Sequence, residues 1–138
     1  MKGRRIAFAA LAWLYLAGVV FQVFLAGVGL FGLGDWTLHA GVGWGLGSAP
    51  LLLLVFVLVA RFDRRTILLA AGLAVSAVIQ PELAAARHTA PIVAAFHPLN
   101  ALVVFWLAWL VAQRSLELVR ATPPVVEAGN VAEPGEAA

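Results

Sequence analysis

Four long apolar runs constrain the fold of this chain more than any other feature, and they lie at about residues 6–30, 36–60, 66–86 and 91–119. Charged residues gather at the ends of these runs and in the short links between them. A helix rises about 1.5 Å per residue, so about 20 apolar residues cross the hydrocarbon core of a bilayer. Inside lipid, backbone amides must be paired within the protein, which restricts such segments to helices. The sequence therefore predicts an all-α integral membrane protein, a four-helix bundle of up-down-up-down topology.

The composition narrows the class further. Of the 138 residues, 63% are hydrophobic and only 12% are charged, too few to cover the surface of a water-soluble domain. The chain has no cysteine, which excludes disulfides, iron–sulfur clusters, thiolate metal sites and covalently attached haem. The pI is near 9.9, but the basic residues form the short flanks that a membrane topology requires. We therefore predict no nucleic-acid partner, and a lipid bilayer as the surroundings.

Local signals mark the ends of the predicted helices. Asp35 is placed to cap the second helix, and Pro50 is expected to bend it. Pro98 lies inside the last run, so regular helix is expected to begin only near Phe96. The first run follows the basic residues 1–5, as the core of a secretory signal peptide would, but its length favours an uncleaved helix.

Residues 1–120 form the predicted transmembrane domain, and residues 121–138 differ from it in composition. This last segment is rich in Pro, Glu, Gly and Ala and has few large groups to pack, so we predict a disordered cytoplasmic tail. Arg87 lies on one side of the four crossings, and the remaining basic residues of the flanks and links lie on the other: Lys2, Arg4, Arg5, Arg61, Arg64, Arg65, Arg114 and Arg120. Basic residues mark cytoplasmic loops. The prediction is a multi-pass protein of the cell's inner membrane with both termini in the cytoplasm.

Two histidines lie near the starts of the predicted second and fourth helices, and both are on the same side of the membrane. His39, Gly43 and Gly47 follow one another at four-residue spacing, so a helix places them on one face, with almost no side chain beneath the imidazole. A flat cofactor would fit against such a face. The helical face of His97 carries Ala101 and Phe105, again a small residue and an aromatic ring.

An internal repeat relates the two histidines. Gln22 and Gln80 are 58 residues apart (80 − 22), and so are His39 and His97 (97 − 39). At this offset the first and third helices carry matching residues around each glutamine: Gly18, Leu25 and Ala26 in one, Ser76, Leu83 and Ala84 in the other. The chain is then interpreted as two repeated helical hairpins, with both histidines at equal depth.

Two imidazoles that approach one iron from different helices of a bundle are the usual ligands of a b-type haem. We therefore predict haem b as cofactor and His39 and His97 as metal ligands. The residues predicted to surround the haem are Gly43, Gly47, Ala101, Phe105, Arg87, Gln22 and Gln80.

Each of these residues also has a plain structural interpretation. Small residues at four-residue spacing pack helices together without a cofactor, and glutamines bond between helices as readily as they contact a haem edge or a quinone. Arg87 either pairs with the haem propionates or extends to the lipid headgroups. His88 is interpreted as an interfacial residue.

The stretches FQVFLAGVGLFG, HAGVGWGLG and HPLNALVVFW resemble the four-helix halves of heme A synthase, and small four-helix bacterial membrane proteins similar to them. The resemblance covers about residues 6–114. It implies a four-helix fold in which His39 and His97 hold a haem at the outer side. The chain has one such half, with no carboxylate in the apolar middle of a crossing and no cysteine pair, so oxidation of a haem methyl group is not implied.

The expected function is cytochrome b-like electron transfer near the non-cytoplasmic face. Two histidine ligands fill both axial positions of the iron, which favours electron transfer over oxygen activation; any enzymatic activity would be redox chemistry of this kind. Electrons would pass to a quinone or a redox partner protein. The alternative is a cofactor-free structural or assembly subunit, acting as a homo-oligomer or within a larger membrane complex. A transporter ranks lower, because no charged residue lies in the apolar middle of a crossing.

Overall fold

The computed structural model describes residues 2–121, so all but the first residue of the tail predicted at 121–138 lies outside the described residues. The described part of the chain is all helical: α1 (Lys2–Leu30), α2 (Thr37–Val59), α3 (Arg64–Ala85), the short 3₁₀ helix η1 (Ala86–His88), α4 (Pro91–Ala94) and α5 (Phe96–Arg120). It contains four helical segments long and apolar enough to cross a membrane. The predicted fold class is confirmed, and the protein is a multi-pass membrane protein.

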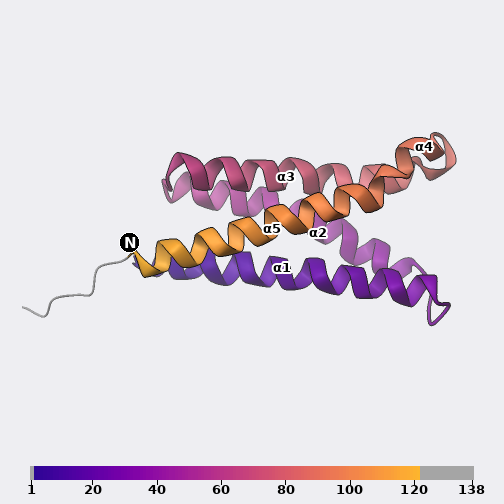
Figure 1. The fold of residues 1–138 in the computed structure, drawn as a ribbon, viewed down its shortest axis with the longest axis horizontal. Coiled ribbons are helices and arrows are strands. Elements are labelled where there is room, and N and C mark those ends of the chain that lie inside the picture. The colour runs from indigo at the N-terminus through magenta and orange to yellow at the C-terminus, as the bar shows by residue number, and fades with distance from the viewer. Residues whose placement is uncertain (1, 122–138) are drawn as a thin grey trace, which may run out of the picture.

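The four long helices form a ring of neighbours. Backbone contacts join α1 to α2, α2 to α3, α3 to α5 and α5 to α1. The helices α2 and α5 therefore face each other across the bundle axis, as do α1 and α3. Figure 1 shows how α2 runs from the C-terminal end of α1 toward the beginning of α3. The α1–α2 hairpin and the α3–α5 hairpin therefore diverge at one end of the bundle.

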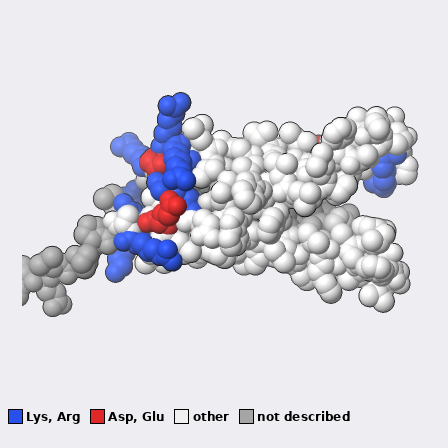
Figure 2. Space-filling model, in the orientation of Figure 1, with Lys and Arg blue, Asp and Glu red and all other residues white. Residues whose placement is uncertain are grey.

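The two ends of the bundle differ in charge. We call the end with the beginning of α1 and the α2–α3 link the basic end, and the end with the α1–α2 link and α4 the histidine end. Figure 2 shows Lys and Arg, with a few carboxylates among them, gathered at the basic end, and an uncharged surface over the middle of the bundle. Large apolar side chains are exposed there, such as Leu14 (71%) and Leu52 (76%), as a bilayer environment requires.

The closely packed core occupies the middle of the bundle and its basic half. Large buried side chains there, including Phe8, Leu73 and Val111, alternate with buried alanines of α1, α3 and α5. Small residues let membrane helices approach closely, so the packing is tightest in this half. Toward the histidine end, the side chains facing the axis are mostly polar and only half-buried. That end is consequently where the hairpins diverge.

The structure shows what happens at the residues that were predicted to cap, bend or begin the helices. α2 begins at Thr37, and the Asp35 carboxylate accepts a hydrogen bond from the Thr37 amide at 2.9 Å, two residues along the chain. Helix α2 continues through Pro50, whose ring is buried. As predicted, α5 begins at Phe96. The segment before it is a separate short helix, α4, because the proline at its first turn fixes a new start.

The α2–α3 link is held by a regular helix-terminating motif. The Phe62 amide donates to the Val57 carbonyl at 3.0 Å, and the Arg61 amide donates to the Leu58 carbonyl at 3.1 Å. Arg61 has φ 53°, the left-handed conformation that glycine usually supplies at this position. Phe62 then packs against Phe8, with ring centroids 5.1 Å apart.

Candidate functional site

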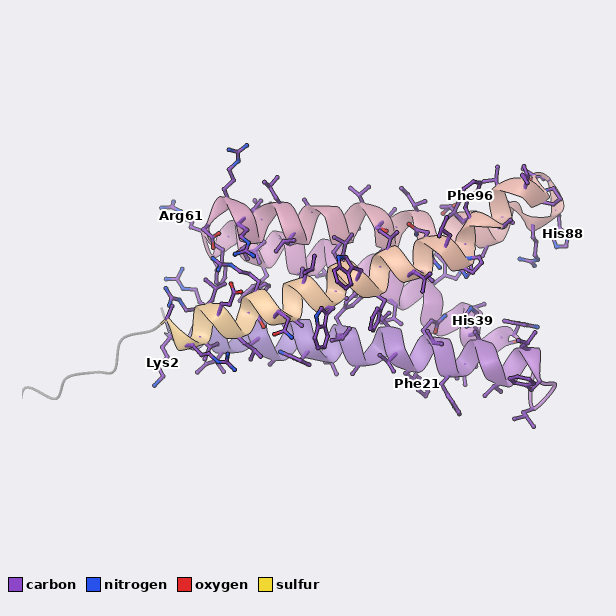
Figure 3. The ribbon with its side chains drawn as sticks, viewed as in Figure 1. Lys2, Phe21, His39, Arg61, His88 and Phe96 are labelled. Atoms are coloured by element: carbon purple, nitrogen blue, oxygen red, sulfur yellow. The ribbon has the colours of Figure 1, made fainter. Side chains whose placement is uncertain are left out.

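The structure brings His39 and His97 together across the bundle axis. The first belongs to the opening turn of α2 and the second to the opening turn of α5. Their ring centroids are 6.4 Å apart, and the ring planes make an angle of 70°. Figure 3 shows His39 far from Lys2 and Arg61 at the basic end, and His88 farther out, where the bundle ends. His88 is exposed and takes no part in the pair.

Each histidine is tied to the glutamine of its own hairpin by a reciprocal pair of hydrogen bonds. Gln22 donates its side-chain amide to the His39 carbonyl at 2.6 Å, and Nδ1 of His39 lies 3.3 Å from the Gln22 carbonyl. Gln80 donates to the His97 carbonyl at 2.9 Å, and Nδ1 of His97 lies 2.9 Å from the Gln80 carbonyl. The repeat seen in the sequence is therefore also a repeat of contacts.

These contacts assign the tautomer of both rings. A backbone carbonyl can only accept, so Nδ1 carries the proton in each imidazole, and Nε2 keeps its lone pair. Histidine ligands of metal ions are commonly held in this way, with Nδ1–H on a carbonyl and Nε2 toward the metal. In the protein alone, the Nε2 atom of His97 lies 3.4 Å from the side-chain amide of Gln80. Both imidazoles thus keep an unprotonated Nε2, which in His97 faces the Gln80 amide.

The second hairpin completes its polar network, whereas the first does not. Asn100 donates to the Gln80 side-chain oxygen at 2.6 Å and to the Ser76 carbonyl at 2.9 Å, and it accepts from the Ser76 hydroxyl at 2.9 Å. One repeat earlier, the positions of Ser76 and Asn100 hold Gly18 and Val42. The side-chain oxygen of Gln22 is accordingly buried without a hydrogen-bond partner among the described residues.

The two glycines predicted beneath His39 are in contact with protein. A Cβ atom at Gly43 would lie 2.8 Å from the side-chain nitrogen of Gln22. A Cβ atom at Gly47 would lie 3.1 Å from the Ala77 carbonyl oxygen and 3.2 Å from the Pro81 ring. The absence of side chains at these positions allows Gln22 to lie across α2 and α3 to approach it closely. The face that the sequence assigned to a cofactor is covered here by α1 and α3.

The remaining predicted site residues lie around the histidine pair. Ala101 is half-buried on α5, and Phe105 is 39% exposed, so its ring also contributes to the lipid-facing surface. Arg87 is exposed on η1, and within residues 2–121 no hydrogen bond or ion pair joins it to either histidine. Sequence reasoning missed Trp36, which packs edge-on against His39 with ring centroids 5.5 Å apart.

The fold and the site together define a four-helix, multi-pass membrane protein with a polar histidine pair near one end of the bundle. The chain matches the model of a "Family of unknown function (DUF6220)" over residues 22–90, half of its length, and it belongs to that family. The match begins at Gln22 and includes His39 and Gln80. No curated protein and no solved structure matches the chain. Among the described residues, no group of three or more His, Cys, Asp or Glu side chains could hold a metal ion.

Exchanging Asn100 and Val42 between the repeats tests the unequal networks. Asn100→Val leaves the Gln80 oxygen and the Ser76 hydroxyl without their partner, which should cost about 1–3 kcal/mol of stability. Val42→Asn supplies a donor next to the unpartnered Gln22 oxygen, and we expect a gain below about 1 kcal/mol. Thermal unfolding of both variants in detergent measures the effects. Equal loss of stability in both would contradict the network described here.

Gly43→Ala tests the contact between Gln22 and α2, with Gly45→Ala as the matched control. A methyl group at residue 43 would displace the Gln22 amide and weaken its bond to the His39 carbonyl. At residue 45 nothing lies within 4 Å of the added carbon, so alanine should stabilise the helix by up to about 1 kcal/mol. We expect the melting temperature to fall for the first variant and to rise for the second. Equal shifts would show that Gln22 does not depend on the glycine.

Proposed function

We propose that this protein is a membrane haem protein in which His39 and His97 hold the iron of one b-type haem. The observation that carries the proposal is the pair of rings, 6.4 Å apart, each with Nδ1 held by a backbone carbonyl. A metal ion bound by Nε2 of two opposed imidazoles, at about 2 Å from each, separates the ring centroids by roughly 6 Å. The spacing and the tautomers therefore suit two imidazoles that would hold one iron between them.

The surroundings also suit a haem in their polarity. Gln22 and Gln80 would keep the two imidazoles in place, and the Gln22 side-chain oxygen has hydrogen-bonding capacity left for a bound group. Ala101 and Phe105 would lie beside it, and Arg87 is the basic residue of this end that would pair with propionates. When bound, the haem would supply reversible one-electron transfer, with a quinone or a redox protein as partner.

We place the basic end in the cytoplasm of a cell with an inner membrane. All nine Lys and Arg residues except Arg87 lie at or near this end, and basic residues are retained on the cytoplasmic side (Figure 2). Both termini of the bundle would then be cytoplasmic, and the histidine pair would lie near the opposite face. Electron transfer would accordingly take place at the non-cytoplasmic side.

Because the sequence contains no cysteine, single introduced thiols can report the orientation of the protein in the membrane. His88→Cys and Lys2→Cys each introduce one thiol, at opposite ends of the bundle. In intact cells, a membrane-impermeant maleimide should label the thiol at residue 88 and leave that at residue 2 unlabelled until the membrane is opened. The reverse pattern would contradict the proposed orientation, since the thiols themselves are chemically equivalent.

The haem proposal is tested by the absorbance spectrum of protein purified after expression with added haem. We expect one haem per chain and the reduced-minus-oxidised spectrum of a six-coordinate b-type haem. His39→Ala and His97→Ala should each abolish this spectrum, whereas His88→Ala, which changes a histidine outside the pair, should retain it. Circular dichroism shows whether each variant keeps its helices. A colourless wild type, or equal loss in all three variants, would contradict the proposal.

The second candidate is a cofactor-free subunit that stabilises or assembles a larger membrane complex. It is favoured by the covered glycines: Gln22 and α3 occupy the space beside Gly43 and Gly47. In this case the polar contacts would serve only to join helices within lipid, as hydrogen bonds between membrane helices do. The same spectra separate the two functions, because a colourless but fully helical wild type is the result expected of the structural subunit.

A further inference from the structure

A basic cavity opens at the end of the bundle remote from the histidines. Its volume is about 330 Å³, and four arginines contribute to its lining, from the start of α1 (Arg4, Arg5), the α2–α3 link (Arg61) and α5 (Arg114). Arg4 donates to the Ala60 carbonyl at 3.4 Å, a contact that leaves its charge in place, and Arg5 donates to the Leu118 carbonyl at 2.8 Å. The cavity is therefore lined with positive charge.

The carboxylate in the lining of the cavity, Asp63, already has partners within the protein. Asp63 lies 3.0 Å from the guanidinium of Arg114 and accepts from the Thr66 hydroxyl at 2.7 Å. Burial acts to raise the pKa of Asp63, but the hydrogen bonds from Thr66 and Arg114 outweigh it and lower the pKa to about 2. Asp63 is thus ionised and pairs with Arg114, which also contacts Glu117 at 2.7 Å. Within the described residues no ion pair joins Arg4 or Arg61 to a carboxylate, so these two charges are in excess.

Arg61 has a backbone conformation that is unfavourable for any residue with a side chain. Its φ of 53° belongs to the left-handed region, where a residue other than glycine is strained by about 1–2 kcal/mol. In the described part of the chain, Arg61 makes no ion pair with a carboxylate. Its charge is therefore available to a ligand in the cavity.

An apolar groove on the same two helices begins close to this cavity. Its volume is about 490 Å³, and it lies between α1 and α2, lined by Leu11, Leu14, Leu52 and Phe56 among others. Phe56 precedes Ala60, in the lining of the basic cavity, by one helical turn. Arg4 and Leu11, seven residues apart, lie on one face of α1. A molecule with an acidic head and an apolar chain would contact both sites.

We propose that the basic cavity and the α1–α2 groove together bind one anionic phospholipid, with its phosphate at Arg4 and Arg61 and an acyl chain in the groove. Two observations identify this ligand: the unbalanced positive charge of the cavity, and the apolar groove that begins one turn away. Basic pockets between membrane helices recognise acidic headgroups, and each basic residue contributes about 1 kcal/mol. The site is independent of the histidine pair and does not rest on haem binding.

The proposal is tested by titrating detergent-purified protein with phosphatidylglycerol or phosphatidylcholine, counting bound lipids by native mass spectrometry and following the melting temperature. We expect one phosphatidylglycerol to bind in preference and to raise the melting temperature. Arg61→Gly should weaken this binding about fivefold, while also relieving the backbone strain, so the variant folds. Arg64→Gln, with the same loss of charge at the same end but outside the cavity lining, should bind phosphatidylglycerol like the wild type.

Other outcomes overturn the proposal. Equal weakening by Arg61→Gly and Arg64→Gln would show attraction to the charged surface as a whole. Equal protection by inorganic phosphate, or unchanged lipid binding after Ala49→Leu narrows the groove, would show an anion site without a lipid chain. Equal binding of both lipids would show that charge does not select the ligand. Cross-linked dimers through the groove, with no lipid retained, would show that a second copy of this chain covers it.

Discussion

The structure depends on the pairing of polar side chains inside an apolar surrounding. Glutamine and histidine side chains cannot hydrogen-bond to the hydrocarbon chains of a bilayer. Each must therefore find a partner within the bundle, or its desolvation costs stability. In both hairpins the solution is the same: the glutamine of the first helix bonds to the backbone at the histidine of the second, and the imidazole bonds back. This reciprocal link fixes the depth of each histidine and directs both imidazoles toward the bundle axis.

The same constraint divides the bundle into two halves with different tasks. Alanines and large apolar side chains fill the interior of the basic half, and polar contacts such as Arg114 with Asp63 lie at its end. At the histidine end, hydrogen bonds replace much of that packing, and the hairpins diverge. A binding site at this end requires less displacement of side chains than one in the core, where Leu73 and Val111 are fully enclosed. The division thus excludes ligands from the enclosed core and leaves the two ends and the outer surface of the bundle as candidate sites.

Much of the fold follows from the sequence because it rests on the chain's own periodicity and length. The four crossings, the beginning of α5 at Phe96 and the approach of His39 to His97 were all predictable from apolar runs, one proline and the repeat. The occupant of a helical face was not, because periodicity shows which residues share a face and not which neighbour covers it. Hence Gly43 was assigned to a cofactor, while the structure places Gln22 against it.

The difference between the hairpins was nevertheless readable. Extending the repeat by three residues beyond the histidines aligns Val42 with Asn100, and this alignment alone indicates that Gln22 lacks the donor that Gln80 possesses. The sequence places Asn100 about one helical turn after His97. Its actual role, a bridge from α5 to Ser76 and Gln80 on α3, depends on the crossing of two helices and could not be derived from one.

The two histidines are consequently not equivalent. His97 is bonded to Gln80, which accepts a hydrogen bond from Asn100, and Asn100 is itself bonded to Ser76. The Nδ1 contact of His97 is 2.9 Å long. His39 is bonded to a glutamine with an unused acceptor, and its Nδ1 contact is 3.3 Å long. A ligand that enters between the rings meets a fixed imidazole on α5 and a less constrained one on α2. Because Gln22 also offers the buried oxygen without a partner, the first hairpin is the side on which a ligand gains most by forming new hydrogen bonds.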